Sequence, residues 1–132
     1  KRGMAATVEE WLAAGEYCLA AGARAVVFCE RGIRSFDDRT RNLLDLASVA
    51  LLRHVHRVPV IVDPSHGLGR RDLVLPLSRA AIAAGAAGLL VEVHPNPGTA
   101  LSDGPQAVSF EAAAALADHL GTDRPAVLAG ES

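Results

Sequence analysis

Pro59 to Gly67 reads Pro-Val-Ile-Val-Asp-Pro-Ser-His-Gly, a short apolar and β-branched run that ends abruptly in polar residues. A run of this length, bounded by turn-forming residues, is typical of a strand that is buried on both faces, as in a parallel sheet. We expect the strand over Val58 to Val62. The turn that follows should direct the side chain of His66 towards the edge at which the strand ends.

Two further apolar runs are expected to form neighbouring strands, one over Ala25 to Cys29 and one over Gly88 to Val93. Hydrophobic residues recur at helical spacing between these runs, and Thr7 with Glu10 matches a capping box at the start of a helix. Helices are therefore expected after Thr7 as far as Gly22, from about Arg39 to His54, from Asp72 to Gly85, and from about Phe110 to Leu120.

This alternation of helices and strands predicts a parallel α/β sheet with helices on one side, in a single domain that spans residues 1–132. A (β/α)8 barrel and an open flavodoxin-like sheet both fit the pattern, and its spacing favours the barrel only slightly. The tail after Gly121 is expected to be mobile.

The composition excludes several classes of partner. The chain has 132 residues, of which 50 % are hydrophobic and 4 % aromatic, and its formal net charge is −2. We expect no basic surface for nucleic acid, and the longest apolar run is interrupted by Gly85 and Gly88, too soon for a membrane span. Cys18 and Cys29 lie in apolar runs and are expected to be buried, reduced thiols, as is typical of a cytoplasmic protein. The chain has no signal peptide and opens with Lys1, so we expect it to begin inside a longer protein.

Polar residues capable of chemistry accompany each expected strand end. Arg31 follows the first strand, His66 follows the second, and Glu92 closes the third. Lys1 lies at a comparable interval before Arg31. The carboxyl ends of parallel strands meet at one edge, where the active sites of βα barrels are built, so we expect these side chains to converge there.

Six segments, in order, resemble the motifs of the class I, β-type 3-deoxy-D-arabino-heptulosonate 7-phosphate (DAHP) synthases. They are Lys1–Met4, Cys29–Phe36, Thr40–Asn42, Pro59–Gly67, Val91–Pro97 and Leu101–Gln106. The resemblance implies a (β/α)8 TIM barrel of which this chain supplies roughly strands five to eight, while the N-terminal half of the barrel is not in this chain. Synthases of 3-deoxy-D-manno-octulosonate 8-phosphate share the Cys-Glu-Arg-Gly element, but Arg34–Asp37 fits the DAHP branch better, and sialic-acid synthases are more distantly similar.

The resemblance implies a cytoplasmic transferase that condenses phosphoenolpyruvate with erythrose 4-phosphate, releases phosphate and begins the shikimate pathway to the aromatic amino acids. It also implies a homo-oligomer, commonly a tetramer. Two alternatives stay open. One is the octulosonate 8-phosphate reaction, and the other is a non-catalytic half-barrel that needs a partner chain, since an isolated half-barrel would expose two open sheet edges.

Roles for single residues follow from the same resemblance. His66, Glu92 and Asp103 correspond to the family's metal ligands, and one imidazole with two carboxylates suits manganese, iron, cobalt or zinc. Arg31 corresponds to the arginine that binds the phosphate of phosphoenolpyruvate. Lys1 corresponds to a lysine that contacts phosphoenolpyruvate and assists proton transfer. His66 and Lys1 are thus the expected catalytic residues.

Simpler interpretations compete with these roles. Asp103 lies in a glycine-flanked loop and could be an ordinary turn aspartate. Arg31 could form an ion pair with Glu30 or Asp63. The family's fourth ligand is a cysteine from the first strand, which has no counterpart here, and Cys29 is expected to be a core residue rather than its replacement.

Several neighbouring residues have two interpretations each. Asp63 could orient Lys1 or cap the local backbone. Arg70 and Arg71 open a helix and could bind a phosphate, although solvated side chains are the simpler interpretation. His94 has the strand parity of Glu92 and could support the metal ligands from behind.

Overall fold

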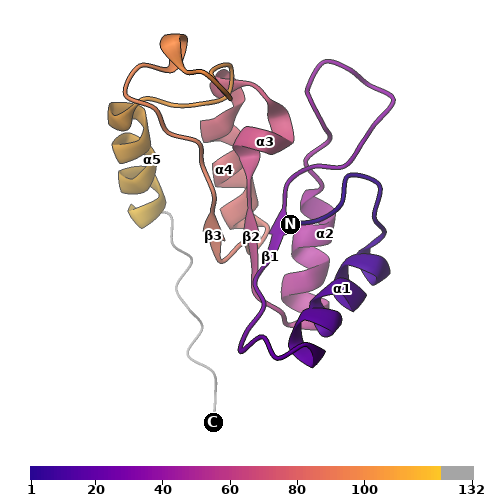
Figure 1. Ribbon diagram of the computed structural model, residues 1–132. Helices are drawn as coiled ribbons and strands as arrows, with labels where there is room; N and C mark the ends of the chain where they lie inside the picture. Colours follow the sequence, from indigo (N-terminus) through magenta and orange to yellow (C-terminus); the bar gives the residue numbers. More distant parts are fainter. Residues whose placement is uncertain (123–132) are drawn as a thin grey trace.

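The structure, a computed structural model, describes residues 1–122 and is built on a parallel sheet of three strands in the order β1-β2-β3 (Figure 1). β1 is Phe28–Glu30, β2 is Val60–Val62 and β3 is Gly88–Leu89, and Cys29 pairs with Ile61. The predicted parallel, adjacent arrangement is therefore confirmed, with each strand shorter than expected. The expectation of a mobile tail after Gly121 concerns residues 123–132, which lie outside the described residues.

The first helix agrees closely with its prediction. α1 is Val8–Ala20, and the capping box is present, since the Thr7 side chain accepts from the Glu10 backbone N–H and the Glu10 side chain accepts from that of Thr7. Cys18 is exposed, so its predicted burial is wrong. The reason is that α1 packs against the core with Val8, Trp11 and Leu12, in its first turns.

The second helix begins later than predicted. α2 is Leu46–Ala50 and continues as a π-helical segment, η1, over Leu51–His56, whereas residues 39–45 form a loop. In that loop the backbone N–H of Asn42 donates to the Gly67 carbonyl at 3.0 Å, and Asn42 Nδ2 donates to the His66 carbonyl at 3.1 Å. These bonds to a distant segment replace helical ones. Asp45 then caps α2 by accepting from the Ser48 N–H at 3.1 Å.

The remaining segments follow β2 and β3. α3 directly follows β2 and was not predicted, and the expected third helix is divided into a 3-10 turn, η2, and α4. Their bounds are α3 Pro64–Leu68, η2 Arg71–Leu73, α4 Val74–Ala83, η3 Pro97–Thr99 and α5 Phe110–Thr122. Within residues 1–122, no helix is long and apolar enough to cross a membrane.

The main hydrophobic core lies on one face of the sheet. Phe28, Val60 and Val62 point into it and meet side chains of α1, α2, η1 and α4, whereas Cys29 and Ile61, of opposite parity, do not belong to it. The ring of Phe28 meets that of Trp11 edge-to-face, with centroids 5.3 Å apart. The helices that share this core therefore cover the same face, and the alternate strand positions point away from it.

A buried polar network joins the N-terminal segment to β1 and α2. Arg2 Nη1 lies 3.1 Å from Glu30 Oε2, 2.9 Å from Asp45 Oδ2 and 3.1 Å from Ser48 Oγ. Glu30 is fully buried and Arg2 is 6 % exposed. Burial raises the pKa of Glu30, although the hydrogen bonds from Arg2 and the Gly32 N–H oppose the rise. Burial would also raise the pKa of Asp45, but hydrogen bonds from Ser48 and Arg2 outweigh it and lower that pKa.

We expect Arg2→Ala to lower the free energy of unfolding of the complete protein by about 3–5 kcal/mol, because it leaves the Glu30 carboxylate buried without its charge partner. The matched control is Arg24→Ala, since Arg24 is exposed and its removal should change stability by no more than about 0.5 kcal/mol. Urea unfolding followed by far-ultraviolet circular dichroism measures both. Equal losses in the two variants would contradict the importance of the network.

Candidate functional site

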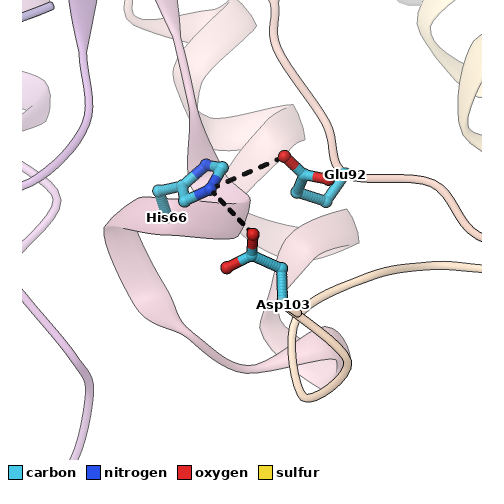
Figure 2. Close-up of side chains that lie close together, drawn as sticks. All are labelled: His66, Glu92 and Asp103. Carbon is cyan, nitrogen blue, oxygen red and sulfur yellow. Dashed lines mark ion pairs between the residues drawn. The ribbon is translucent and has the colours of Figure 1, made fainter. Parts of the chain in front are cut away.

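Three residues from separate segments converge beyond the carboxyl ends of the strands (Figure 2). His66 lies on α3, Glu92 follows β3, and Asp103 lies in the loop between η3 and α5. His66 Nε2 is 3.6 Å from Glu92 Oε1 and 3.7 Å from Asp103 Oδ2. One ligand atom from each residue lies within 4.8 Å of the others. The resemblance to the DAHP synthases implied these same three residues as metal ligands.

Asp63 holds both the backbone and the ring of His66. Asp63 is the N-cap of α3, and its Oδ1 accepts from the His66 backbone N–H at 2.9 Å. Asp63 Oδ2 lies 2.8 Å from His66 Nδ1. Because the carboxylate can only accept there, we assign the proton to Nδ1, which leaves the lone pair of Nε2 facing Glu92 and Asp103.

Lys1 reaches the same buried carboxylate. Its Nζ lies 2.6 Å from Asp63 Oδ2, and the Lys1 side chain is 43 % exposed, whereas that of Asp63 is fully buried. Both interpretations of Asp63 are therefore realised at once, since the carboxylate caps α3 and also orients Lys1. The ammonium of Lys1 and the imidazole of His66 share one oxygen atom as their partner.

Glu92 is positioned through its backbone. The Ser65 hydroxyl, fully buried on α3, accepts from the Glu92 N–H at 3.1 Å. On the other side, the Glu92 carbonyl accepts from the Val108 N–H at 3.0 Å. The segment after β3 is thus tied both to the helix that carries His66 and to the segment that follows Asp103.

Asp103 is both a turn residue and a member of the cluster. Its φ of 56° lies in the left-handed region, which non-glycine residues seldom adopt. Its carbonyl accepts from the Gln106 and Ala107 N–H groups at 3.1 and 2.9 Å, and the Gln106 side-chain amide donates to its Oδ1. Oδ2 is left to face His66.

The three side chains fit a divalent cation. The distances of 3.6 and 3.7 Å from Nε2 to the carboxylates are too long for hydrogen bonds. They are close to the separation of about 3–3.6 Å between two ligands that each lie about 2.0–2.2 Å from one ion. An imidazole lone pair and two carboxylate oxygens are all electron donors, so a positive charge between them would relieve their repulsion.

Arg31 follows β1 at the same edge of the sheet. The two carboxylates considered as its partners are otherwise engaged, Glu30 by Arg2 and Asp63 by Lys1 and His66. The expected alternative of an ion pair between Arg31 and either of them is therefore wrong. Among residues 1–122, no carboxylate forms an ion pair with its guanidinium.

The other residues near the cluster that had two interpretations each have partners in the structure. Arg70 pairs with Asp72 on the surface, whereas Arg71 donates to carbonyls of the loop that carries Asp103. His94 Nδ1 accepts from the Asn96 N–H at 3.0 Å and does not belong to the cluster. Cys29 is buried, as expected, although it points away from the main hydrophobic core, and burial raises the pKa of its thiol.

Several supporting residues carried no assigned role in the sequence. Arg2, Asn42 and Gln106 each hold a site segment through side-chain hydrogen bonds. All three lie inside the motifs that carry the resemblance, so membership of a motif was the one available signal.

Comparison with known proteins gives a consistent result. The family model described as the DAHP synthetase I family matches residues 1–129. A phospho-2-dehydro-3-deoxyheptonate aldolase from Thermotoga maritima is 55 % identical over 111 residues, which make up 84 % of this chain and 33 % of that protein. A 2-dehydro-3-deoxyphosphooctonate aldolase from Burkholderia multivorans is 41 % identical over 114 residues, 77 % of this chain and 39 % of that protein.

Solved structures agree with the sequence matches. The crystal structure of the Thermotoga maritima phospho-2-dehydro-3-deoxyheptonate aldolase (DAHP synthase) matches with a TM-score of 0.88 at 50 % identity, over 92 % of this chain and 36 % of that chain. A truncated form of the synthase from the same organism has the same TM-score and is covered to 46 %. This chain thus spans less than half the length of these relatives, and within that span its backbone superposes on those of the two solved structures with a TM-score of 0.88. The chain belongs to the DAHP synthetase I family.

Proposed function

We propose that the protein containing this chain condenses phosphoenolpyruvate with erythrose 4-phosphate, giving DAHP and inorganic phosphate at a divalent metal site. The observation that carries the proposal is the convergence of His66, Glu92 and Asp103 in a chain that is 55 % identical to a phospho-2-dehydro-3-deoxyheptonate aldolase. The reaction joins carbon three of phosphoenolpyruvate to the aldehyde carbon of the sugar. Water supplies the oxygen at carbon two, and phosphate leaves.

The proposed architecture is a (β/α)8 barrel to which this chain contributes roughly strands five to eight. Two features support it. The Arg2 N–H donates to the Cys29 carbonyl at 3.0 Å, so the N-terminal segment runs beside β1. Val93 and Val108 form a parallel bridge beyond β3. A segment of this chain therefore lies beside each outer strand, residues near Arg2 beside β1 and residues near Val108 beyond β3. The helices that pack on the main core cover one face of the sheet, as they do in a barrel.

His66, Glu92 and Asp103 would hold the metal ion. When bound, the ion would act as a Lewis acid towards the aldehyde oxygen of the sugar phosphate. Asp63 keeps the His66 ring in the tautomer that offers Nε2. Asp63 therefore orients the imidazole of His66, and Glu92 and Asp103 supply the negative charge of the proposed metal site, before any substrate binds.

Arg31 and Lys1 are the proposed substrate-binding groups. The Arg31 guanidinium, which has no ion-pair partner among the described residues, is suited to bind the phosphate of phosphoenolpyruvate through paired N–H groups. Lys1 would contact the same substrate and move a proton at its Nζ, while Asp63 holds that ammonium in place. Manganese, iron, cobalt or zinc would suit the three metal-binding side chains.

The proposed assembly is a homo-oligomer, a tetramer, in the cytoplasm.

A second candidate is the octulosonate 8-phosphate reaction, because relatives with that name are 41 % identical. The two reactions differ in the sugar by one carbon atom, four carbons for the heptulosonate and five for the octulosonate. The higher identity to the heptonate enzyme favours the four-carbon sugar. Supplying the complete protein with each aldose phosphate separately decides between them, and activity with neither would support the non-catalytic half-barrel.

His66→Ala should lower metal-dependent turnover in the complete protein by roughly 1000-fold or more, because the loss of a Lewis acid removes several kcal/mol of transition-state stabilisation. Titration of chelator-stripped protein with manganese should show a matching loss of affinity. The control is His94→Ala, since His94 lies outside the cluster, and it should bind manganese normally. If His66→Ala keeps full metal-stimulated activity, the metal assignment is wrong.

Arg31→Ala should raise the KM for phosphoenolpyruvate by about 10–100-fold, because a hydrogen bond to a charged group contributes about 1.5–3 kcal/mol. Manganese affinity should be unchanged, since Arg31 is not among the metal-binding candidates. Consumption of phosphoenolpyruvate, followed by ultraviolet absorbance, gives the KM. Arg34→Ala, at an exposed arginine nearby, is the control, and an equal rise in its KM would argue against a specific phosphate contact.

A further inference from the structure

Arg71 connects the start of η2 to the loop that carries Asp103. Its guanidinium donates through Nη2 to the Gly104 carbonyl at 2.6 Å and through Nε to the Ala107 carbonyl. Its backbone N–H donates to the Pro105 carbonyl at 3.1 Å. One residue thus supplies three hydrogen bonds to the four residues that follow Asp103.

The adjacent arginine has none of these contacts. Among residues 1–122, the Arg70 guanidinium bonds to Asp72 alone, with Nη2 2.7 Å from Oδ2, and the Arg70 side chain is 52 % exposed. The two residues have the same charge and are next to each other in the chain. They differ in whether they reach the Asp103 loop, so Arg70 is a natural control for Arg71.

No side chain from Pro97 to Pro105 is buried, although Ala107 and Val108, which follow, are. Leu101 is fully exposed, and a hollow of about 450 Å³ is bounded by the loop and by Arg71 itself. Asp103 is also in the left-handed region, at φ 56°, which costs a non-glycine residue roughly 1 kcal/mol or more. Polar contacts must therefore maintain the conformation of the loop. Arg71 provides the hydrogen bonds that reach the backbone of residues 104–107 from outside the loop, and Arg41 Nη1 lies 4.0 Å from the Asp103 carboxylate.

We propose that Arg71 is a positioning residue that fixes the Asp103 carboxylate opposite His66 and Glu92 and thereby raises the affinity of the site for a divalent metal; this rests on the proposed metal site. Arg71 acts only through backbone carbonyls and does not touch the cluster. Two of the five N–H groups of the guanidinium, those on Nε and Nη2 that form its side-on edge, already donate to carbonyls of the loop.

The experiment measures manganese affinity in the complete, chelator-stripped protein by isothermal titration calorimetry. Arg71→Ala should weaken binding by about 10–100-fold, the usual effect of removing a residue that orients a metal ligand. Arg71→Lys should recover part of the loss, because one ammonium can still donate to a carbonyl. Arg70→Ala should bind manganese within about twofold of the unaltered protein, since its contact with Asp72 is exposed.

A second measurement separates positioning from general destabilisation. Hydrogen exchange of the metal-free protein should accelerate in residues 97–107 of Arg71→Ala and stay unchanged in β1 and β2, whose hydrogen bonds do not involve Arg71. If Arg71→Ala does not fold, Arg71→Lys carries the same comparison with a smaller expected effect.

The outcomes are distinguishable. Normal manganese affinity in Arg71→Ala, or a rise only in the KM of a phosphorylated substrate, would overturn the proposal in favour of a substrate contact or no role. Unaltered manganese binding in His66→Ala would instead refute the metal site itself. Even then, an unchanged hydrogen-exchange rate in residues 97–107 of Arg71→Ala would refute the claim that Arg71 holds the Asp103 loop.

Discussion

The candidate site depends on the hydrogen bonds and the ion pair that the buried carboxylate of Asp63 accepts. Asp63 is completely removed from solvent, and an ionised group in that position costs several kcal/mol unless it is paired and hydrogen-bonded. Its two oxygens accept from the His66 backbone N–H, the His66 ring and the Lys1 ammonium. These hydrogen bonds cap α3 at its first residue, set the tautomer of the His66 imidazole and hold Lys1 at the edge of the sheet.

Close approach of backbones supports the same edge. Gly32 has a φ of 88°, and a Cβ added there would lie 2.6 Å from the Asn42 Cβ and 3.1 Å from the Gly67 Cα. Only a glycine allows the segment after β1, the following loop and α3 to come this close. Asn42 uses that proximity to donate to the His66 carbonyl, so the loop that replaces the expected start of the second helix also steadies the candidate metal ligand.

Structural and chemical roles alternate along the chain. Arg2 and Glu30 form a buried ion pair on the core side of β1, while their sequence neighbours Lys1 and Arg31 lie at the edge where the site is built. Successive residues of an extended chain point in opposite directions, which makes this division of labour possible. A change that loosens the buried pair would consequently displace both proposed substrate-binding groups.

From the sequence one could predict the parallel sheet and the end of β2 at Val62, and the resemblance of its motifs to the DAHP synthases implied the grouping of His66, Glu92 and Asp103. Strand burial and helical periodicity are local properties of the chain, and the motifs supplied the grouping. That Glu30 pairs with Arg2 and that residues 39–45 form a loop became visible in the folded chain alone. It alone also separated Arg71 from Arg70, which the sequence treated alike. The physical reason is that a buried or bridging polar group takes its partner from whichever distant segment packs against it, and the local sequence does not encode that choice.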